Sequence, residues 1–486
     1  MMIRSSPATY TPTGLAHYDG NPLIEALPAI HEDEVIGELL CNFPEFPNAA
    51  EMALSAKLRA HCVSRISDIV VPMELHLQFE ASLSQLIRAG YTARNPLDRD
   101  AVAMLHAADD DQLRHCGFKS SASSLAIFGL SGMGKTTLLN SLVKTYPQVI
   151  VHKRYAGKAL KRTQVVWLKV DCPHDGSPRG LCASFFSALD AAIGTDYTDR
   201  YMKPRASVSM LLQHVSQLSR SFNVGVLIVD ELQNLNLLAD ADAKQRILNF
   251  FLTLSNDSGI PLVYSGTNST FKLFSKVVRN ARRALGMSDY YFDRFRIQDD
   301  EWSALVQTFL AYNWTQEPIE LTSELNETLY DLSQGNTDFL AKLMMLTQWY
   351  ALSNDEKITP ALYRKVYERQ MIILHKPIEA LRSNDPLQID DFEDMMPARE
   401  QVAQMLAAAR MRQARRMGLL IHRTPLPDPL SNDLLEKTAG RRRGHLAAVA
   451  DTSVVSDAQK VAESDDWETT AAEKGFTSLD GDIDLW

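Results

Sequence analysis

A glycine-rich stretch at residues 129–136, GLSGMGKT, constrains the fold of this chain more than any other feature. It follows the apolar run SLAIFG and precedes TLLNSLVKTY, whose apolar residues recur at helical spacing, so it joins a strand to a helix. Glycines let the main chain curl until its N–H groups point at one anion, and the following helix directs its positive end there. The sequence therefore predicts a phosphate-binding loop formed by Gly129, Leu130, Ser131, Gly132, Met133, Gly134, Lys135 and Thr136, with Thr137 beside it.

Two side chains at the end of this loop suit a nucleoside triphosphate and its metal ion. Lys135 is expected to reach the β- and γ-phosphates, and the Thr136 hydroxyl is expected to coordinate Mg²⁺. The motif thus predicts ATP and Mg²⁺ as cofactors.

A pair of acidic residues follows a second apolar run, VLIV at residues 226–229. Asp230 and Glu231 therefore stand at the carboxyl end of a predicted strand, where parallel α/β sheets bind their ligands. We expect Asp230 to hold Mg²⁺ together with Thr136, and Glu231 to be the base that polarises an attacking water. The pattern predicts an enzyme that hydrolyses ATP with the help of Mg²⁺.

Short β-rich runs alternate with helical segments between residues 119 and 300. The runs are SLAIFG, VVWLKVD, GVLIVDE, PLVYSG and YYFDRFRI. Strands separated by helices are typical of a parallel sheet that is covered on both faces. We predict an α/β fold, with a doubly wound, five-stranded parallel sheet, a helical lid, and helical extensions at both ends of the chain.

Changes in composition suggest how the chain is divided. Residues 1–50 mix proline and turn residues with short apolar clusters, which predicts an extended N-terminal arm that binds a partner. The remaining segments are predicted as a helical subdomain (51–118), a nucleotide-binding core (119–300), a helical lid (301–383), a C-terminal helical extension and linker (384–440) and a disordered acidic tail (441–486).

The extra strands and the glutamate beside the metal-holding aspartate resemble the arrangement in AAA+ ATPases. Thr267 and Asn268, after PLVYSG, lie where that family places its sensor-1 residue, although a simple turn that ends the strand is the alternative. Arg282 and Arg283 lie where AAA+ proteins place an arginine finger that enters the neighbouring subunit's site. A solvated helix end is the alternative for this arginine cluster.

The predicted lid departs from the AAA+ pattern. Asp338 occupies the position that usually holds the sensor-2 arginine, and Lys342, one helical turn later, could substitute for it. This departure favours slow hydrolysis that acts as a timer over a fast motor.

A basic segment without acidic residues extends from residue 138 to residue 170. We expect its basic side chains to neutralise DNA phosphates without reading bases, and a solvated basic loop is the alternative. The predicted contacts are Lys153, Arg154, Lys158, Lys161 and Arg162. The net charge of −10 does not argue against this, because residues 451–486 alone hold ten acidic and two basic residues.

Beyond these motifs, roughly residues 14–383 resemble one family, the TnsC/TniB regulators of heteromeric cut-and-paste transposons, which include CRISPR-associated transposons. The stretches that carry the resemblance are NPLIEALP, IRAGYTARNP, TYPQVIVH, LKVDCPHDGS, VRNARRALG, LSQG and EALRS. The segment after about residue 425 shows no such resemblance.

The resemblance implies an ATP-dependent regulator of DNA transposition. ATP-bound subunits would assemble as a homo-oligomer, a heptameric ring or filament, around double-stranded DNA. They would couple a target-selector protein of the TnsD/TniQ type to transposase subunits of the TnsA/TnsB type, and hydrolysis would release the assembly.

Two other function classes share these motifs. A replication initiator or helicase loader would need a further DNA-reading domain, which residues 384–486 do not resemble, and a STAND-type signalling NTPase would carry repeats or an effector domain. The chain has no apolar run long enough for a membrane span and no signal-peptide stretch, so we expect a cytoplasmic protein without a membrane partner.

Overall fold

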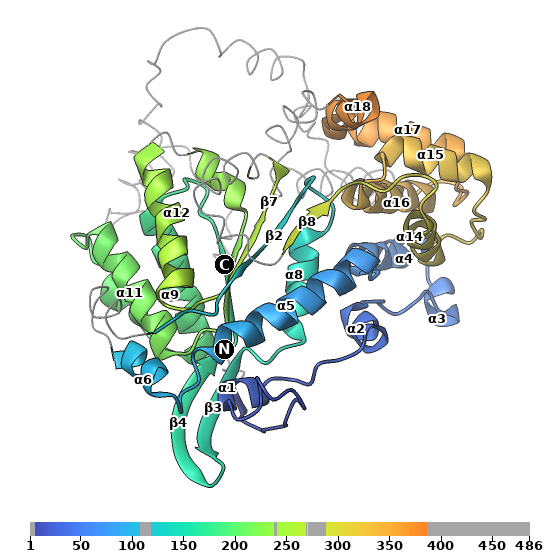
Figure 1. Ribbon diagram of the computed structural model, residues 1–486. Coiled ribbons are helices and arrows are strands. Elements are labelled where there is room, and N and C mark those ends of the chain that lie inside the picture. Colours follow the sequence, from blue (N-terminus) through green and yellow to red (C-terminus); the bar gives the residue numbers. More distant parts are fainter. Residues whose placement is uncertain (1–4, 107–117, 238–240, 269, 271–287, 386–486) are drawn as a thin grey trace, which may run out of the picture. The chain divides into compact units, whose positions relative to one another are not determined.

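The computed structural model describes residues 5–106, 118–237, 241–268, 270 and 288–385 (Figure 1). The strands are β1 (Ser5–Pro7), β2 (Ser124–Gly129), β3 (Val149–Tyr155), β4 (Lys158–Val165), β5 (Trp167–Asp171), β6 (Val226–Asp230), β7 (Leu262–Gly266) and β8 (Ser288–Phe292). The helices of the first half are α1 (Pro22–Glu25), α2 (Asp33–Leu40), α3 (Ala49–Met52), α4 (Ala56–Cys62), η1 (Val63–Asp68), α5 (Glu74–Thr92), α6 (Arg99–His106), α8 (Lys135–Lys144), α9 (Pro178–Ile193), α10 (Tyr197–Tyr201) and α11 (Val208–Ser221). The later helices are η2 (Leu232–Leu237), α12 (Ala241–Asn256), α14 (Asp300–Ala311), α15 (Ser323–Ser333), α16 (Thr337–Leu352), α17 (Pro360–Gln370), η3 (Ile372–Leu374) and α18 (His375–Ser383).

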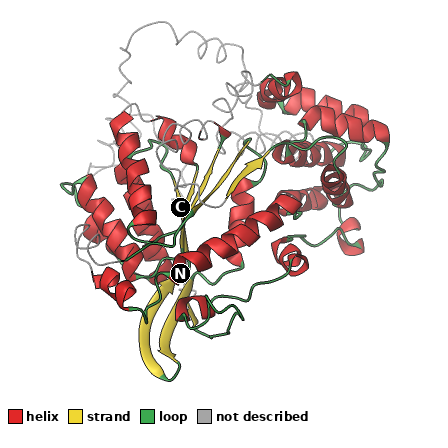
Figure 2. Ribbon diagram, in the orientation of Figure 1, coloured by secondary structure: helices red, strands yellow, loops and turns green. Residues whose placement is uncertain are grey.

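The main sheet has five parallel strands in the order β5-β6-β7-β2-β8. Figure 2 shows the strands in yellow among the red helices. Four of these strands fall within runs expected from the sequence and β8 overlaps the fifth run, so the predicted doubly wound α/β fold is confirmed. Strand β8 begins at Ser288, two residues before the predicted run YYFDRFRI, and ends at Phe292, five residues before the end of that run. The order places the carboxyl ends of β2, β6 and β7 side by side, and that edge holds the site described below.

Alternating residues of the central strands point into two separate hydrophobic cores. On β2, Leu125 and Ile127 join the core that includes α5, α8 and the helices after residue 300. Ala126 and Phe128 join the other core, which is formed with α9, α11 and α12. This is why the run reads as continuously apolar: a strand that is covered on both faces needs no polar side.

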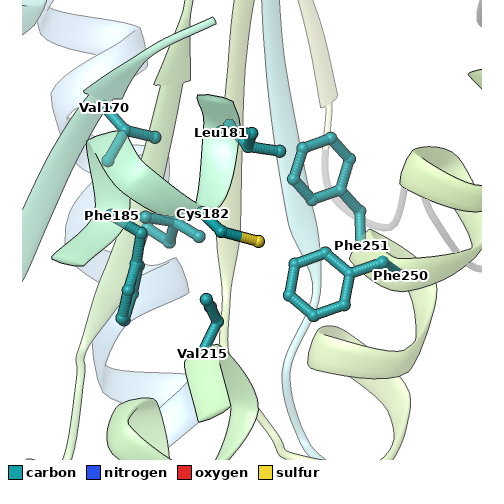
Figure 3. Close-up of a pocket in the computed structure, with 8 residues that line it drawn as sticks. Val170, Leu181, Cys182, Phe185, Val215, Phe250 and Phe251 are labelled. Carbon is teal, nitrogen blue, oxygen red and sulfur yellow. The ribbon is translucent and has the colours of Figure 1, made fainter. Parts of the chain in front are cut away.

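A small apolar cavity lies in the second core (Figure 3). Its lining consists of Val170, Leu181, Cys182, Phe185, Val215, Leu227, Phe250 and Phe251. Apart from the Cys182 thiol, the lining is hydrocarbon, and burial raises the pKa of that thiol to about 12. A ligand site needs polar groups that fix orientation, so this cavity is a packing gap.

A second, three-stranded sheet has the order β1-β3-β4, and no sequence pattern predicted it. Strands β3 and β4 form an antiparallel hairpin that extends away from the main sheet (Figure 1). The turn residues Ala156 and Gly157 have φ of 46° and 80°. Positive φ at both central residues fits the two-residue turn that matches strand twist, for which Asn-Gly is the usual signal.

The N-terminal residues pack on this hairpin rather than forming the extended arm predicted for residues 1–50. Strand β1 pairs in parallel with β3, the Tyr10 hydroxyl lies 2.9 Å from Nδ1 of His152, and the Tyr155 hydroxyl donates to Glu25 at 2.8 Å. The sequence prediction missed these contacts because each one joins residues more than a hundred positions apart.

The helices between residues 49 and 106 are not a separate subdomain, which corrects a second expectation. Helix α5 packs against the main sheet, whereas α4 packs against α16 of the predicted lid. Arg59 on α4 is 3% exposed and donates two hydrogen bonds, of 2.9 and 2.8 Å, to the carboxylate of Glu356. The N-terminal helices therefore connect the sheet to the lid.

The predicted lid consists of helices joined by loops, as expected: α14, α15, α16, α17, η3 and α18. The predicted C-terminal extension (384–440) lies outside the described residues except for Asn384 and Asp385, and the predicted tail (441–486) lies wholly outside them. In the described part of the chain, every helix is too short or too polar to traverse a lipid bilayer.

Candidate nucleotide site

The loop between β2 and α8 has the backbone that its glycines predicted. Gly132 and Gly134 have φ of 84° and 86°, in the left-handed region that side chains disfavour. At Gly129, φ is 144°, and a Cβ atom would lie only 2.0 Å from the Phe292 carbonyl oxygen. The strand β8 therefore fixes where the loop begins, and Gly134 caps the N-terminus of α8, where an anion is stabilised.

Lys135 is folded over the loop that precedes it. Its Nζ atom donates to the carbonyl oxygens of Gly129 and Leu130, each at 2.8 Å, and the residue is 9% exposed. The ammonium group is thereby held within the curve of the loop, where its charge would meet a phosphate.

The structure brings Thr136 and Asp230 together although 94 positions separate them. The Thr136 hydroxyl donates to Oδ2 of Asp230 at 3.0 Å, and Asp230 ends β6 in a nearly fully buried position. Burial disfavours the ionised form, but the ammonium of Lys169 and several hydrogen bonds outweigh it, so the pKa of Asp230 lies below its usual value. Asp230 is consequently a buried carboxylate, which is the ligand type that Mg²⁺ prefers.

Glu231 is exposed and adopts a left-handed backbone conformation, with φ of 55°. For a residue with a Cβ atom this costs about 1 kcal/mol. Its main-chain N–H donates to Oδ1 of Asp230 at 3.0 Å, and its carboxylate accepts a hydrogen bond from Nε2 of Gln233. The carboxylate is thus held by a side chain that the sequence prediction did not include.

The predicted sensor residues follow the strand next to the one that ends in Asp230. Thr267 and Asn268 directly follow β7, the neighbour of both β6 and β2 in the sheet, and Thr267 is 6% exposed. A Cβ atom at Gly266 would lie 3.2 Å from Oε1 of Gln233, so Gln233 reaches from Glu231 to the end of β7. Arg282 and Arg283 lie outside the described residues.

The lid contacts the loop directly. The main-chain N–H of Asp338 donates to the Gly132 carbonyl at 3.1 Å, and the Asp338 carboxylate forms an ion pair with Lys342. Asn336, whose side chain caps α16, also donates to the Ser131 carbonyl. The sequence pattern indicates the segment 333–338, but it does not mark Asn336 as the residue that makes this contact.

Four of the five predicted DNA-binding side chains are exposed on the hairpin, and Arg162 is half-buried. Arg154 pairs with Ala159 across the hairpin, beyond a shift of register that lies between His152 and Arg154. His152 and Gln164 are buried instead, and they contact the N-terminal residues. The part of the basic segment that holds the five predicted contacts is therefore a strand pair, in place of the loop considered from the sequence.

The residues present fit a nucleotide with its metal ion. The loop offers glycine main-chain N–H groups and one ammonium, and Thr136 and Asp230 offer two oxygens for a hard cation. When bound, Mg²⁺ would neutralise charge on the phosphates that ATP supplies.

Comparisons with known proteins agree with this description. Residues 118–274 match the family model described as AAA domain. No curated protein matches the chain. Several solved structures are similar to it in part.

Three solved structures illustrate the similarity, each with 14% sequence identity to this chain. The match with the Walker-type ATPase PABY2304 of Pyrococcus abyssi spans 60% of this chain and 84% of the chain of that protein, with a TM-score of 0.35. The match with the Aeropyrum pernix ORC1 protein in complex with DNA spans 72% of this chain and 87% of the chain of that protein, with a TM-score of 0.40. The match with Cdc6p from Pyrobaculum aerophilum spans 72% of this chain and 89% of the chain of that protein, with a TM-score of 0.39. The family match, the strand order and the phosphate-binding loop together show that this chain contains an AAA domain with the AAA+ P-loop fold.

Proposed function

We propose that this protein is an ATP-dependent regulator of DNA transposition. It assembles on double-stranded DNA as a homo-oligomeric ring or filament, couples a target selector of the TnsD/TniQ type to a transposase of the TnsA/TnsB type, and disassembles when ATP is hydrolysed. The sequence resemblance supports the partners, and one structural observation supports DNA binding most directly: the exposed basic hairpin attached to the ATPase domain.

In the proposed ATPase reaction each residue has a separate task. Lys135 and the main-chain N–H groups of the loop bind the phosphates, while Thr136 and Asp230 hold Mg²⁺. Glu231 polarises the attacking water, and Thr267 or Asn268 orients it. Arg282 or Arg283 would enter from the neighbouring subunit, which makes activity depend on assembly.

The hairpin supplies the proposed contact with DNA. The N-terminal residues contact the buried His152 and Gln164, whereas Lys153, Arg154 and Lys161 are exposed. Such side chains neutralise phosphates without reading sequence. A single subunit makes few of these contacts, so assembly of several subunits multiplies a weak affinity.

Electron microscopy tests the proposal. The purified protein is imaged with a non-hydrolysable ATP analogue, with and without a DNA duplex, and we expect rings or filaments only when both are present. Monomers that ignore DNA would reject transposition regulation, and nucleotide-dependent opening without DNA would favour a signalling NTPase.

A salt titration tests the hairpin. Replacing Lys153, Arg154 and Lys161 with Ala should weaken DNA binding and reduce the slope of log affinity against log salt by about 2 to 3. ATP binding should not change. The matched control replaces Lys203 and Arg205, two exposed basic residues after α10, and should leave the slope as it is. An unchanged slope in the hairpin variant would place the DNA site elsewhere.

A further inference from the structure

A lysine ammonium lies beside the carboxylate that is proposed to hold the metal ion. Lys169 belongs to β5, the strand next to β6, and its Nζ atom is 3.0 Å from Oδ2 of Asp230. The Lys169 side chain is 16% exposed and that of Asp230 is 3% exposed. The pair is thus largely shielded from water, where opposite charges interact more strongly than at the surface.

Lys169 and Thr136 share the same oxygen atom. Oδ2 of Asp230 accepts from the Thr136 hydroxyl at 3.0 Å, whereas Oδ1 of Asp230 accepts the main-chain N–H of Glu231. The oxygen that faces Thr136, and with it the proposed metal position, is therefore the one that already carries a cationic partner.

Lys169 also has a second partner that points away from the carboxylate. Its Nζ atom donates to Oδ1 of Asn140 on α8 at 3.0 Å, and Asn140 is exposed. The ammonium can lose Asp230 and still keep one hydrogen bond at the surface. Lys169 lies within the acid-free segment of the sequence, but it is on the main sheet and not on the hairpin.

We propose that Lys169 is the resident counter-ion of Asp230, which neutralises the buried carboxylate when no divalent cation is bound and competes with Mg²⁺ for it. This inference rests on the proposed role of Asp230 in the ATPase site. Two consequences follow from linkage. Lys169 stabilises the nucleotide-free protein, and it raises the Mg²⁺ concentration that nucleotide binding requires.

The test compares Lys169→Met, which keeps the length of the side chain and removes its charge, with Lys169→Arg, which keeps the charge. Lys144→Met, at an exposed lysine of α8, is the matched control. Binding of a fluorescent ATP analogue is followed as free Mg²⁺ is increased, and thermal unfolding is measured in EDTA and in Mg²⁺ with the analogue.

For Lys169→Met we expect the Mg²⁺ concentration at half-maximal binding to fall at least threefold and the melting temperature in EDTA to fall. The melting temperature should rise more on adding Mg²⁺ and the analogue than it does in the unmodified protein. Lys169→Arg and Lys144→Met should behave as the unmodified protein does. A Mg²⁺ midpoint that is unchanged or higher in Lys169→Met overturns the inference.

Asp230→Asn separates this inference from the proposed function. If Asp230→Asn shifts the Mg²⁺ requirement strongly while Lys169→Met does not, only the counter-ion role fails. If neither variant shifts it, Asp230 does not hold the metal, and both the site assignment and the inference are wrong.

Discussion

The side-chain amide of Asn336 donates from Nδ2 to the main-chain carbonyl of Ser131 at 2.9 Å, which joins the first turn of α16 to the phosphate-binding loop. The same side chain accepts the N–H groups of Asp338 and Phe339 through Oδ1, so one amide both caps the helix and contacts the loop. The position of the lid and the shape of the loop are consequently coupled through Asn336.

Replacing Asn336 with Ala should lower both stability and nucleotide affinity. Loss of the helix cap costs about 1 kcal/mol of the free energy of unfolding, and loss of the contact with Ser131 should weaken binding of an ATP analogue several-fold. Thr322→Ala is the matched control, because Thr322 caps α15 in the same lid. Denaturant unfolding and nucleotide titration should show a stability loss in both variants and an affinity loss only in Asn336→Ala. Equal affinities would contradict the coupling.

Gln233 should matter for hydrolysis and not for binding. Its amide holds the carboxylate of Glu231, so Gln233→Leu is expected to lower kcat for ATP by about tenfold while the affinity for nucleotide stays the same. Gln245→Leu, at an exposed amide on α12, is the control and should leave kcat as it is. Steady-state hydrolysis and analogue binding measure the two quantities. A normal kcat in Gln233→Leu would remove Gln233 from any role in positioning Glu231.

The ion pair between Arg59 and Glu356 should stabilise the junction between the N-terminal helices and the lid. Arg59→Met leaves Glu356 without its partner and should cost about 3 kcal/mol of the free energy of unfolding. Lys357→Met is the control, because Lys357 and Glu317 form an exposed pair at 3.7 Å that should contribute less than about 0.5 kcal/mol. Denaturant unfolding measures both. Similar losses of the free energy of unfolding in the two variants would mean that the buried Arg59–Glu356 pair stabilises the protein no more than the exposed pair does.

Stability should fall as the solution is acidified from about pH 6.5 towards pH 4. Burial lowers the pKa of His76 to about 4, and in the unfolded chain it titrates near 6.5, so the unfolded state binds more protons in this window. The full change in pKa of His76 corresponds to about 3 kcal/mol of the free energy of unfolding. Burial lowers the pKa of His152 as well, which acts in the same direction. Thermal unfolding across this range should show a shallower pH dependence in His76→Gln. His61→Gln, at an exposed position, should keep the original slope.

The nucleotide site could be predicted from the sequence because its parts are local. Residues 129–136 and the pair Asp230 and Glu231 each follow an apolar strand, and the carboxyl ends of parallel strands meet at one edge of the sheet. The residue patterns at the two strand ends were therefore enough to predict that Thr136 and Asp230 lie close together.

The hairpin and the N-terminal contacts could not be predicted in the same way. The turn has Ala156 where Asn or Asp is the usual signal, and two of the buried positions of the hairpin are filled by His152 and Gln164, which do not look like core residues. Gln233, Asn336 and Arg59 act through hydrogen bonds to groups that only the folded chain brings near, and no local pattern marks them.

The alternation of side chains along β2 also fixes where the phosphate-binding loop lies relative to Asp230. If β2 moved by one residue against β7, Leu125 and Ile127 would exchange places with Ala126 and Phe128, so both cores would lose their packing at once. The same step would carry Gly129 about 3.3 Å along the sheet relative to Asp230. A shift of that size is as long as a hydrogen bond, so the filling of the two cores selects the one alignment in which Thr136 can reach Asp230.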